Sequence, residues 1–322
     1  MHRASGQGDL GRAWLSPKLG RNLRLERIAA AFDWAAVERL TASVHAARSG
    51  RPSWPPLVMV KALLLQQWYG LSDPGLEEAL GDRLSFRRFV GLGLDEGAPD
   101  HSTLSRFRKA LREKGLDRSL FEEINRQLEV RGLVVKTGTL MDATLVEAEA
   151  RKPPARTKAE LGAKGSGDPD ADWTRKGGRS HYGYKAHLGV DQGSGLIRRA
   201  VLTSAKVYES EVAEQLICGD ERAVYGDRAY EHKARRARLR AAGIKDRILH
   251  RSHKNQAALP PWQAARNRLI GPVRAAVERT FGTLKRTYGY RRVRYRSLAA
   301  NTLQLRFLCI AFNLRKAEAL LA

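Results

Sequence analysis

A single glutamate stands between two cations near the C-terminal end of the sequence. In the stretch RAAVERTFGTLK, a helix would place Arg274, Glu278 and Lys285 on one face, because they recur at i, i+4 and i+11. Glu278 is the one acid in residues 273–298, against eight Lys or Arg at positions 274, 279, 285, 286, 291, 292, 294 and 296. A solvated helix with an Arg–Glu pair explains the spacing alone. A metal-binding carboxylate beside bound phosphates also explains why one acid lies in so basic a segment.

Two aspartates follow predicted strands. Asp142 lies in the β-like stretch 137–147, and Asp227 follows a short strand at 222–225. Strands are also predicted at 180–191, 196–203 and 244–249, with a hairpin turn at 192–195 and helices at 209–217 and 231–242. This order predicts an α/β domain of ribonuclease H-like fold, a mixed five-stranded sheet with flanking helices. In such a fold the two strand ends lie side by side, and the closing helix can bring Glu278 to them.

Three converging carboxylates would bind divalent cations. Carboxylate oxygens suit Mg²⁺, and two ions about 4 Å apart can activate an attacking water or 3′-hydroxyl and stabilise the departing oxygen. We therefore predict a site for two Mg²⁺ ions, with Mn²⁺ as a substitute, in which Asp142, Asp227 and Glu278 are the ligands. Arg274 and Lys285 would hold phosphates beside it. Either aspartate alone is more often a turn residue or a helix cap, so the prediction depends on their combination.

Composition points to a polyanionic partner. The 322 residues carry a net charge of +24, and 43% of them are hydrophobic, which supports a real core. Nucleic acid is the first expectation and an anionic membrane surface the second. No apolar run reaches membrane-spanning length, no signal peptide opens the chain, and the two cysteines, Cys218 and Cys309, form no Cys-x-x-Cys pair. We expect a protein that works in a reducing cytoplasm.

The pattern divides the chain into three parts. Residues 1–24 are rich in Gly, Arg and Ser and are predicted to be flexible. Residues 25–132 form an all-α DNA-binding domain, in which Ser72 and Asp100 begin helices. The helix 103–114 could read DNA as in a helix-turn-helix protein, although a plain helical bundle with a solvated basic face would look the same. Residues 133–322 form the catalytic domain, with a mobile basic loop at 151–180.

Basic residues on several predicted elements are candidate DNA contacts. For each group the alternative is a solvated helix or strand face, and the overall charge favours phosphate contact. Tyr182 and Tyr184 could stack on an unpaired base, but packing in the core is an equal expectation. The DNA-binding candidates are Arg106, Arg108, Lys109, Lys185, His187, Arg235, Arg236, Arg279, Arg286, Arg291, Arg292 and Arg294.

These residues carry a resemblance to a known family. The stretches LMDATLVEA, VYGDRAYEHKARRARLRAAGI and VRAAVERTFGTLKRTYGYRRVRYRSL, together with DHSTLSRFRKAL near the N-terminus, resemble DDE transposases of bacterial insertion sequences. The likeness covers about residues 25–315 and is to the insertion sequence family 5 branch of the family 4 superfamily. It implies that Asp142, Asp227 and Glu278 are catalytic metal ligands. Arg274 and Lys285 match the signature Tyr-(2)-Arg-(3)-Glu-(6)-Lys, whereas the tyrosine position holds Gly271, which puts a hairpin cleavage route in question.

The resemblance implies a transposase that binds the terminal inverted repeats of an insertion sequence and performs Mg²⁺-dependent cleavage and strand transfer. Its partners would be double-stranded DNA, at the element ends and the target, and a second copy of the chain in a homodimer on paired ends. Two alternatives stay open: a ribonuclease H-fold nuclease without strand transfer, and a transposase-derived DNA-binding regulator without activity. The five intact site residues argue against the regulator.

Overall fold

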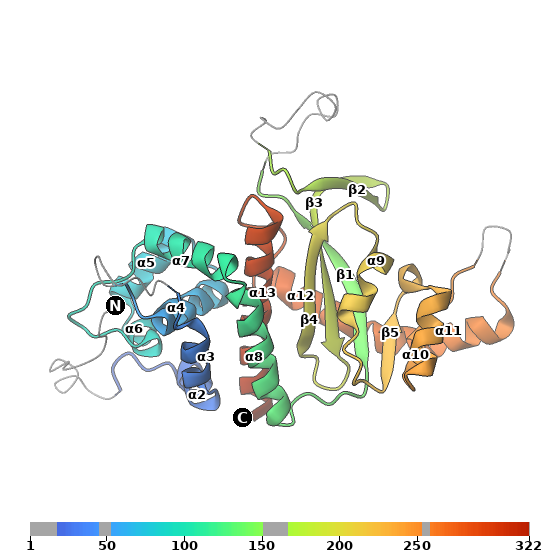
Figure 1. The fold of residues 1–322 in the computed structure, drawn as a ribbon, viewed down its shortest axis with the longest axis horizontal. Helices are drawn as coiled ribbons and strands as arrows, with labels where there is room; N and C mark the ends of the chain where they lie inside the picture. Colours follow the sequence, from blue (N-terminus) through green and yellow to red (C-terminus); the bar gives the residue numbers. More distant parts are fainter. Residues whose placement is uncertain (1–17, 45–52, 151–166, 253–257, 322) are drawn as a thin grey trace. The chain divides into compact units, whose positions relative to one another are not determined.

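The protein divides into two compact units. The structure, a computed structural model, describes residues 18–44, 53–150, 167–252 and 258–321. Unit 1 comprises Met1–Val130 and Arg306–Ala322, and unit 2 comprises Arg131–Leu305. Unit 1 is helical, and unit 2 is built on a mixed sheet with helices (Figure 1). None of the described helices is long and apolar enough to cross a membrane.

Helices make up the described part of unit 1. The predicted caps are confirmed: the side chain of Ser72 accepts a hydrogen bond from the Gly75 amide, and Asp100 accepts one from the Thr103 amide. The apolar faces of these helices form the core of the unit, which includes Leu76 and Phe107. The helices are α2 (Leu23–Ala31), α3 (Trp34–Thr41), α4 (Pro56–Tyr69), α5 (Asp73–Asp82), α6 (Leu84–Val90), α7 (His101–Glu113), α8 (Leu116–Val130) and the second part of α13 (Leu298–Leu321).

Two predicted boundaries differ from the structure. Helix α2 begins inside the segment 1–24 that was predicted to be flexible, and the rest of that segment up to residue 17 lies outside the described residues. The C-terminal segment from Arg306 packs with the helical unit and not with the catalytic domain. The reason is a set of contacts across unit 1: Arg306 pairs with Asp117, and the Trp68 indole donates to the Ala311 carbonyl at 2.8 Å.

The sheet of unit 2 has the predicted ribonuclease H-like topology. Its five main strands lie in the order β4 (Ile197–Ser204), β3 (Arg179–Asp191), β1 (Thr139–Glu147), β5 (Ala223–Gly226), β6 (Lys245–Ile248). Strands β1, β3 and β4 pair antiparallel, while β5 runs parallel to β1 and β6 runs parallel to β5. The prediction of a mixed five-stranded sheet flanked by helices and preceded by helices is therefore confirmed, with one further short strand.

That further strand corrects the predicted loop at 151–180. Strand β2 (Asp172–Lys176) pairs antiparallel with the first half of β3, and the Trp173 ring packs on Tyr182 at a centroid distance of 5.4 Å. The ladder and this aromatic contact order residues that look like a basic loop by composition. Residues 151–166 lie outside the described residues.

Helices of unit 2 pack on individual strands of the sheet. Helix α9 (Glu209–Leu216) packs on β1, β3, β4 and the 3-10 turn η1 (Arg228–Tyr230). Helix α10 (Lys233–Ala241) packs on β6, and α12 (Ala276–Arg286) packs on β1. The predicted closing helix is divided, since Arg274 ends α11 (Pro261–Arg274), a helix the sequence pattern did not reveal, and Glu278 lies in α12. Ala275 keeps a right-handed helical conformation at the junction, so the two side chains remain one turn apart.

Candidate active site

Asp142 and Asp227 are placed by the parallel strands β1 and β5. The last registered pair of these strands is Leu140 with Tyr225, and each aspartate is two residues beyond that pair, so the two are level with each other. Asp227 directly follows β5, whereas Asp142 lies inside β1; the prediction that Asp142 ends its strand is wrong, because β1 stays paired with β3 as far as Glu147. Asp227 caps η1 by accepting from the Ala229 amide at 2.8 Å. Burial raises the pKa of Asp142, and the negative charge of Asp227 adds to this rise while Arg274 opposes it.

Arg274 links Asp142 to Glu278. Its guanidinium donates to the Asp142 Oδ2 atom at 3.1 Å and to the Glu278 Oε1 atom at 2.9 Å. The Arg274 and Asp142 side chains are 17% and 16% exposed, whereas Glu278 is 62% exposed. Two carboxylates thus turn toward a single cation, and the more buried of them is Asp142.

The three predicted acids do not form a closed ion cage. A metal ion could be held by a group of His, Cys, Asp and Glu whose ligand atoms all lie within 4.8 Å of one another. Among the described residues, such a group is formed by Cys218, Asp220 and Glu221, and not by the three predicted acids. That group is already neutralised, because Arg198 and Lys136 both pair with Asp220. The predicted acids still fit a hard divalent cation, since their donors are carboxylate oxygens and Arg274 is a cation placed between two of them.

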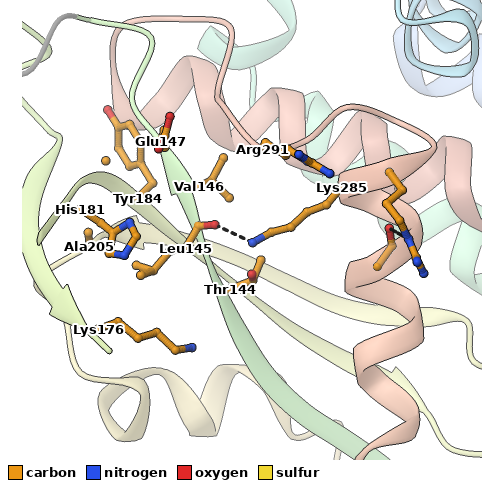
Figure 2. A pocket seen from close by; sticks show the side chains of 13 residues that line it. Thr144, Leu145, Val146, Glu147, Lys176, His181, Tyr184, Ala205, Lys285 and Arg291 are labelled. Atoms are coloured by element: carbon orange, nitrogen blue, oxygen red, sulfur yellow. Dashed lines mark hydrogen bonds between the residues drawn. The ribbon is translucent and has the colours of Figure 1, made fainter. Parts of the chain in front are cut away.

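Lys285 lies in a basic cavity beside strand β1. Its Nζ atom donates to the Leu145 carbonyl at 3.0 Å, as Figure 2 shows, and the cavity measures about 780 Å³. Lys176, His181, Arg286 and Arg291 also line it, with Glu147 as the single acid. Burial lowers the pKa of Lys285, and the charges of Lys176 and Arg291 lower it further. Such a concentration of cations favours an anionic occupant.

Comparison with known proteins decides the family. Residues 135–314, more than half of the chain, match the family model described as Transposase DDE domain, and residues 14–110 match the Transposase domain (DUF772). The chain belongs to the DDE transposase family. The piggyBac transposase, solved by cryo-EM as a synaptic complex with hairpin DNA, is similar at 11% identity and a TM-score of 0.42. That match covers 92% of this chain and 72% of the other, and it is too distant to bear on the site.

Four predicted DNA contacts of this transposase are corrected by burial or by internal ion pairs, and two of them, the buried Arg235 and the partly buried Arg236, are on helix α10. Arg235 is buried and bonds to Glu214, Ser210 and the Tyr230 carbonyl. Arg236 pairs with Glu231 and Asp246 and donates to the Ile248 carbonyl. Both guanidiniums are therefore engaged inside the unit. The basic composition of the helix could not show which of its sides packs on the sheet.

The other two corrections are Arg108 and His187. Arg108 on α7 is 8% exposed at its side chain and forms an ion pair with Asp73. His187 is fully buried, and its Nε2 atom lies 2.9 Å from the Thr203 hydroxyl oxygen. Burial, with the neighbouring charge of Lys185, lowers the pKa of His187 to about 4, so the ring is neutral at pH 7. Neither side chain faces solvent as a phosphate contact requires.

The remaining basic candidates of the transposase stay accessible to different degrees. The Lys185 Nζ atom donates to the Val207 carbonyl at 2.8 Å. Tyr182 and Tyr184 are buried, with hydroxyls that donate to the carbonyl and carboxylate of Asp168, so core packing holds for both. Arg294 is partly exposed, and the exposed candidates are Arg106, Lys109, Arg279, Arg286, Arg291 and Arg292.

One acid near the transposase site was missed in the sequence. Glu209, the first residue of α9, is partly buried, and its pKa is raised by burial and then by the charges of Asp227 and Asp142. The pattern offered one signal, an acid that opens a helix directly after a strand of the sheet. That signal is weak, because acids are common in the first turn of any helix.

Proposed function

We propose that this DDE transposase binds the terminal inverted repeats of an insertion sequence and carries out Mg²⁺-dependent DNA cleavage and strand transfer. Asp142, Asp227 and Glu278 are the metal ligands in this proposal. The observations that support it best are the level positions of Asp142 in β1 and Asp227 after β5, and the hydrogen bonds of Arg274 to both Asp142 and Glu278. The spacing of Arg274, Glu278 and Lys285 supports the family 4 superfamily of insertion sequences, in which we place the chain in the family 5 branch.

Each side chain has a distinct task in the reaction. Two bound Mg²⁺ ions, or Mn²⁺ in their place, would activate the attacking water or 3′-hydroxyl and stabilise the leaving oxygen. Asp142 within β1 and Asp227 directly after β5 would hold the ions at fixed positions, since both accept local amide hydrogen bonds. Glu278, exposed on α12, closes the ligand set. Arg274 and Lys285 bind phosphates next to the scissile bond, where the cavity around Lys285 is basic.

Double-stranded DNA is the proposed partner, at the element ends and at the target. Exposed arginines follow α12 and the segment after it, at positions 279, 286, 291 and 292. In unit 1, Arg106 and Lys109 are exposed on α7, which supports this helix as the DNA reader. We further propose a homodimer that holds the paired ends, acting in the bacterial cytoplasm at the nucleoid.

The test uses Asp227→Asn in the full chain. Binding of end DNA should persist, because the substitution leaves the basic surfaces intact, while cleavage and joining should disappear. Glu211→Gln is the matched control, an exposed carboxylate of the same unit that should keep both reactions. Joining retained by Asp227→Asn would remove Asp227 from the mechanism.

Pre-cut ends separate transposition from hydrolysis alone. A transposase should insert the free 3′-hydroxyl of a pre-cut end covalently into target DNA. A nuclease of the same fold would cleave intact ends but join none, and a DNA-binding regulator would do neither. The wild-type chain is expected to give inserted products that depend on a divalent cation.

A further inference from the structure

Glu209 begins a helix that packs beside the strands of the two aspartates. Strand β4 pairs antiparallel with β3, which pairs antiparallel with β1, so β4 and β1 run in the same direction. Tyr184 of β3 pairs with both Val146 of β1 and Ser204, so β4 ends level with Val146, beyond Asp142. The chain then turns, and α9, which begins at Glu209, packs on β1 and on η1, the turn that follows Asp227.

Helix α9 is fastened to the turn that follows Asp227. Arg235 donates to the Ser210 carbonyl at 2.6 Å and to Glu214 at 2.7 Å, and the same guanidinium bonds the Tyr230 carbonyl in η1. On the other side of Glu209, Lys185 donates to the Val207 carbonyl at 2.8 Å. These bonds hold the first turn of α9 against η1, so the position of Glu209 is built into the fold.

A buried hydroxyl faces the same acids. Tyr230 is fully buried, and among the described residues its hydroxyl has no hydrogen-bond partner. Burial raises the pKa of Tyr230 well above its usual value, and the charges of Glu209, Asp142 and Asp227 raise it further. A buried donor without an acceptor destabilises the metal-free protein. An oxygen ligand carried into the site by a cation would supply the acceptor.

We propose that Glu209 is a fourth carboxylate of the divalent-cation site, and that the Tyr230 hydroxyl donates to an oxygen ligand of the bound ion. Glu209 comes from helix α9, an element separate from those that carry Asp142, Asp227 and Glu278. The inference rests on the proposed function, in which Asp142 and Asp227 bind that ion. Lys185 and Lys176, whose charges act on Glu209, moderate the repulsion among the acids when no ion is bound.

A simpler role for Glu209 would be to interact with the positive end of its own helix. Glu211 lies in the same first turn and is exposed, so it has the same relation to the helix dipole. A dipole interaction does not require the burial of Glu209 beside two other carboxylates. The pair Glu209→Gln and Glu211→Gln therefore separates the two roles, since both variants lose one acid from the first turn.

The experiment is a titration of the full-length chain with Mn²⁺, followed by the electron paramagnetic resonance signal of the free ion. Glu209→Gln should weaken Mn²⁺ binding about tenfold, the loss typical of residues that support a metal site. Glu211→Gln should bind as the wild type does. Unfolding temperatures in EDTA check that both variants fold. Wild-type affinity in a folded Glu209→Gln variant would overturn the proposal.

Two further variants complete the design. Asp227→Asn should abolish tight Mn²⁺ binding. Normal binding by this variant would contradict the proposed metal site itself. Normal binding by Glu209→Gln alone would contradict only the role of Glu209. Should Glu209→Gln not fold, Glu209→Asp keeps the charge with a shorter reach, and unchanged affinity there would also overturn the proposal. Tyr230→Phe should keep or raise the metal-free unfolding temperature and weaken Mn²⁺ binding severalfold. Unaltered Mn²⁺ affinity in this variant would show that the Tyr230 hydroxyl does not contact a ligand of the ion.

Discussion

Replacing Arg274 by Met tests whether this side chain neutralises the site in the absence of a metal ion. Methionine keeps an apolar stem but removes both hydrogen bonds and the charge. Removing one partner of a buried ion pair costs about 3–5 kcal/mol. Since Arg274 and Asp142 are 17% and 16% exposed and so not fully buried, we expect a cost at or just below the lower end of that range, about 2–3 kcal/mol. The pair with Glu278, which is 62% exposed, adds about 0.3–0.5 kcal/mol.

The assay is urea denaturation in EDTA at pH 7.5 and at pH 4, followed by circular dichroism. At pH 4 the difference from the wild type should shrink, because the pKa of Asp142 is already raised and its protonated form needs no cation. Mg²⁺ should stabilise Arg274→Met more than the wild type, since the ion replaces the lost charge. Arg286→Met, exposed on α12, is the control and should change stability by less than about 0.5 kcal/mol. An equal loss at both pH values would refute this reasoning.

Two further predictions follow from burial. Because burial raises the pKa of Asp142, its stabilising contribution is present at low pH and is lost as the pH rises through the folded-state pKa. Without metal, Asp142→Asn should therefore be more stable than the wild type at pH 7.5 and equal to it near pH 4. Thermal unfolding at the two pH values measures this difference. Arg108→Met should lower the free energy of unfolding by about 3 kcal/mol without changing the salt dependence of DNA binding. Lys109 is the exposed neighbour, and Lys109→Met should leave the free energy of unfolding nearly unchanged but reduce the salt slope of DNA binding by about 1. A reduced salt slope in Arg108→Met would contradict the conclusion that Arg108 does not contact DNA.

Local signals in the sequence were sufficient for most of the fold. Ser72 and Asp100 cap their helices as predicted, because a short polar side chain before an apolar helical pattern has one favourable use. The alternation of residues 180–191 and the glycines of the following turn predicted the β3–β4 hairpin. Strand β2 could not be predicted from local signals, since its formation depends on pairing with β3 and on Trp173 packing against Tyr182.

In the candidate site, too, local patterns could be predicted from the sequence and long-range contacts could not. Asp142, Asp227 and Glu278 could be proposed from the sequence because strand ends and a helix repeat are local patterns, and the fold order says which strand ends are adjacent. The pattern of Arg235 and Arg236 could not show that both point inward to Glu214 and Asp246. Helical periodicity shows which residues share a face, but long basic side chains suit a packed face and a solvated face alike.

By itself, the sequence determined that this chain has a ribonuclease H-like sheet with one aspartate in β1 and one directly after β5, and a basic C-terminal segment around one glutamate. Only the tertiary structure decided which cations form internal ion pairs, that Arg274 joins Asp142 to Glu278, and that α9, which begins at Glu209, packs on β1 and η1. The physical reason is distance along the chain: strand and helix patterns act within a few residues, whereas these contacts join residues far apart in sequence and depend on how the elements pack.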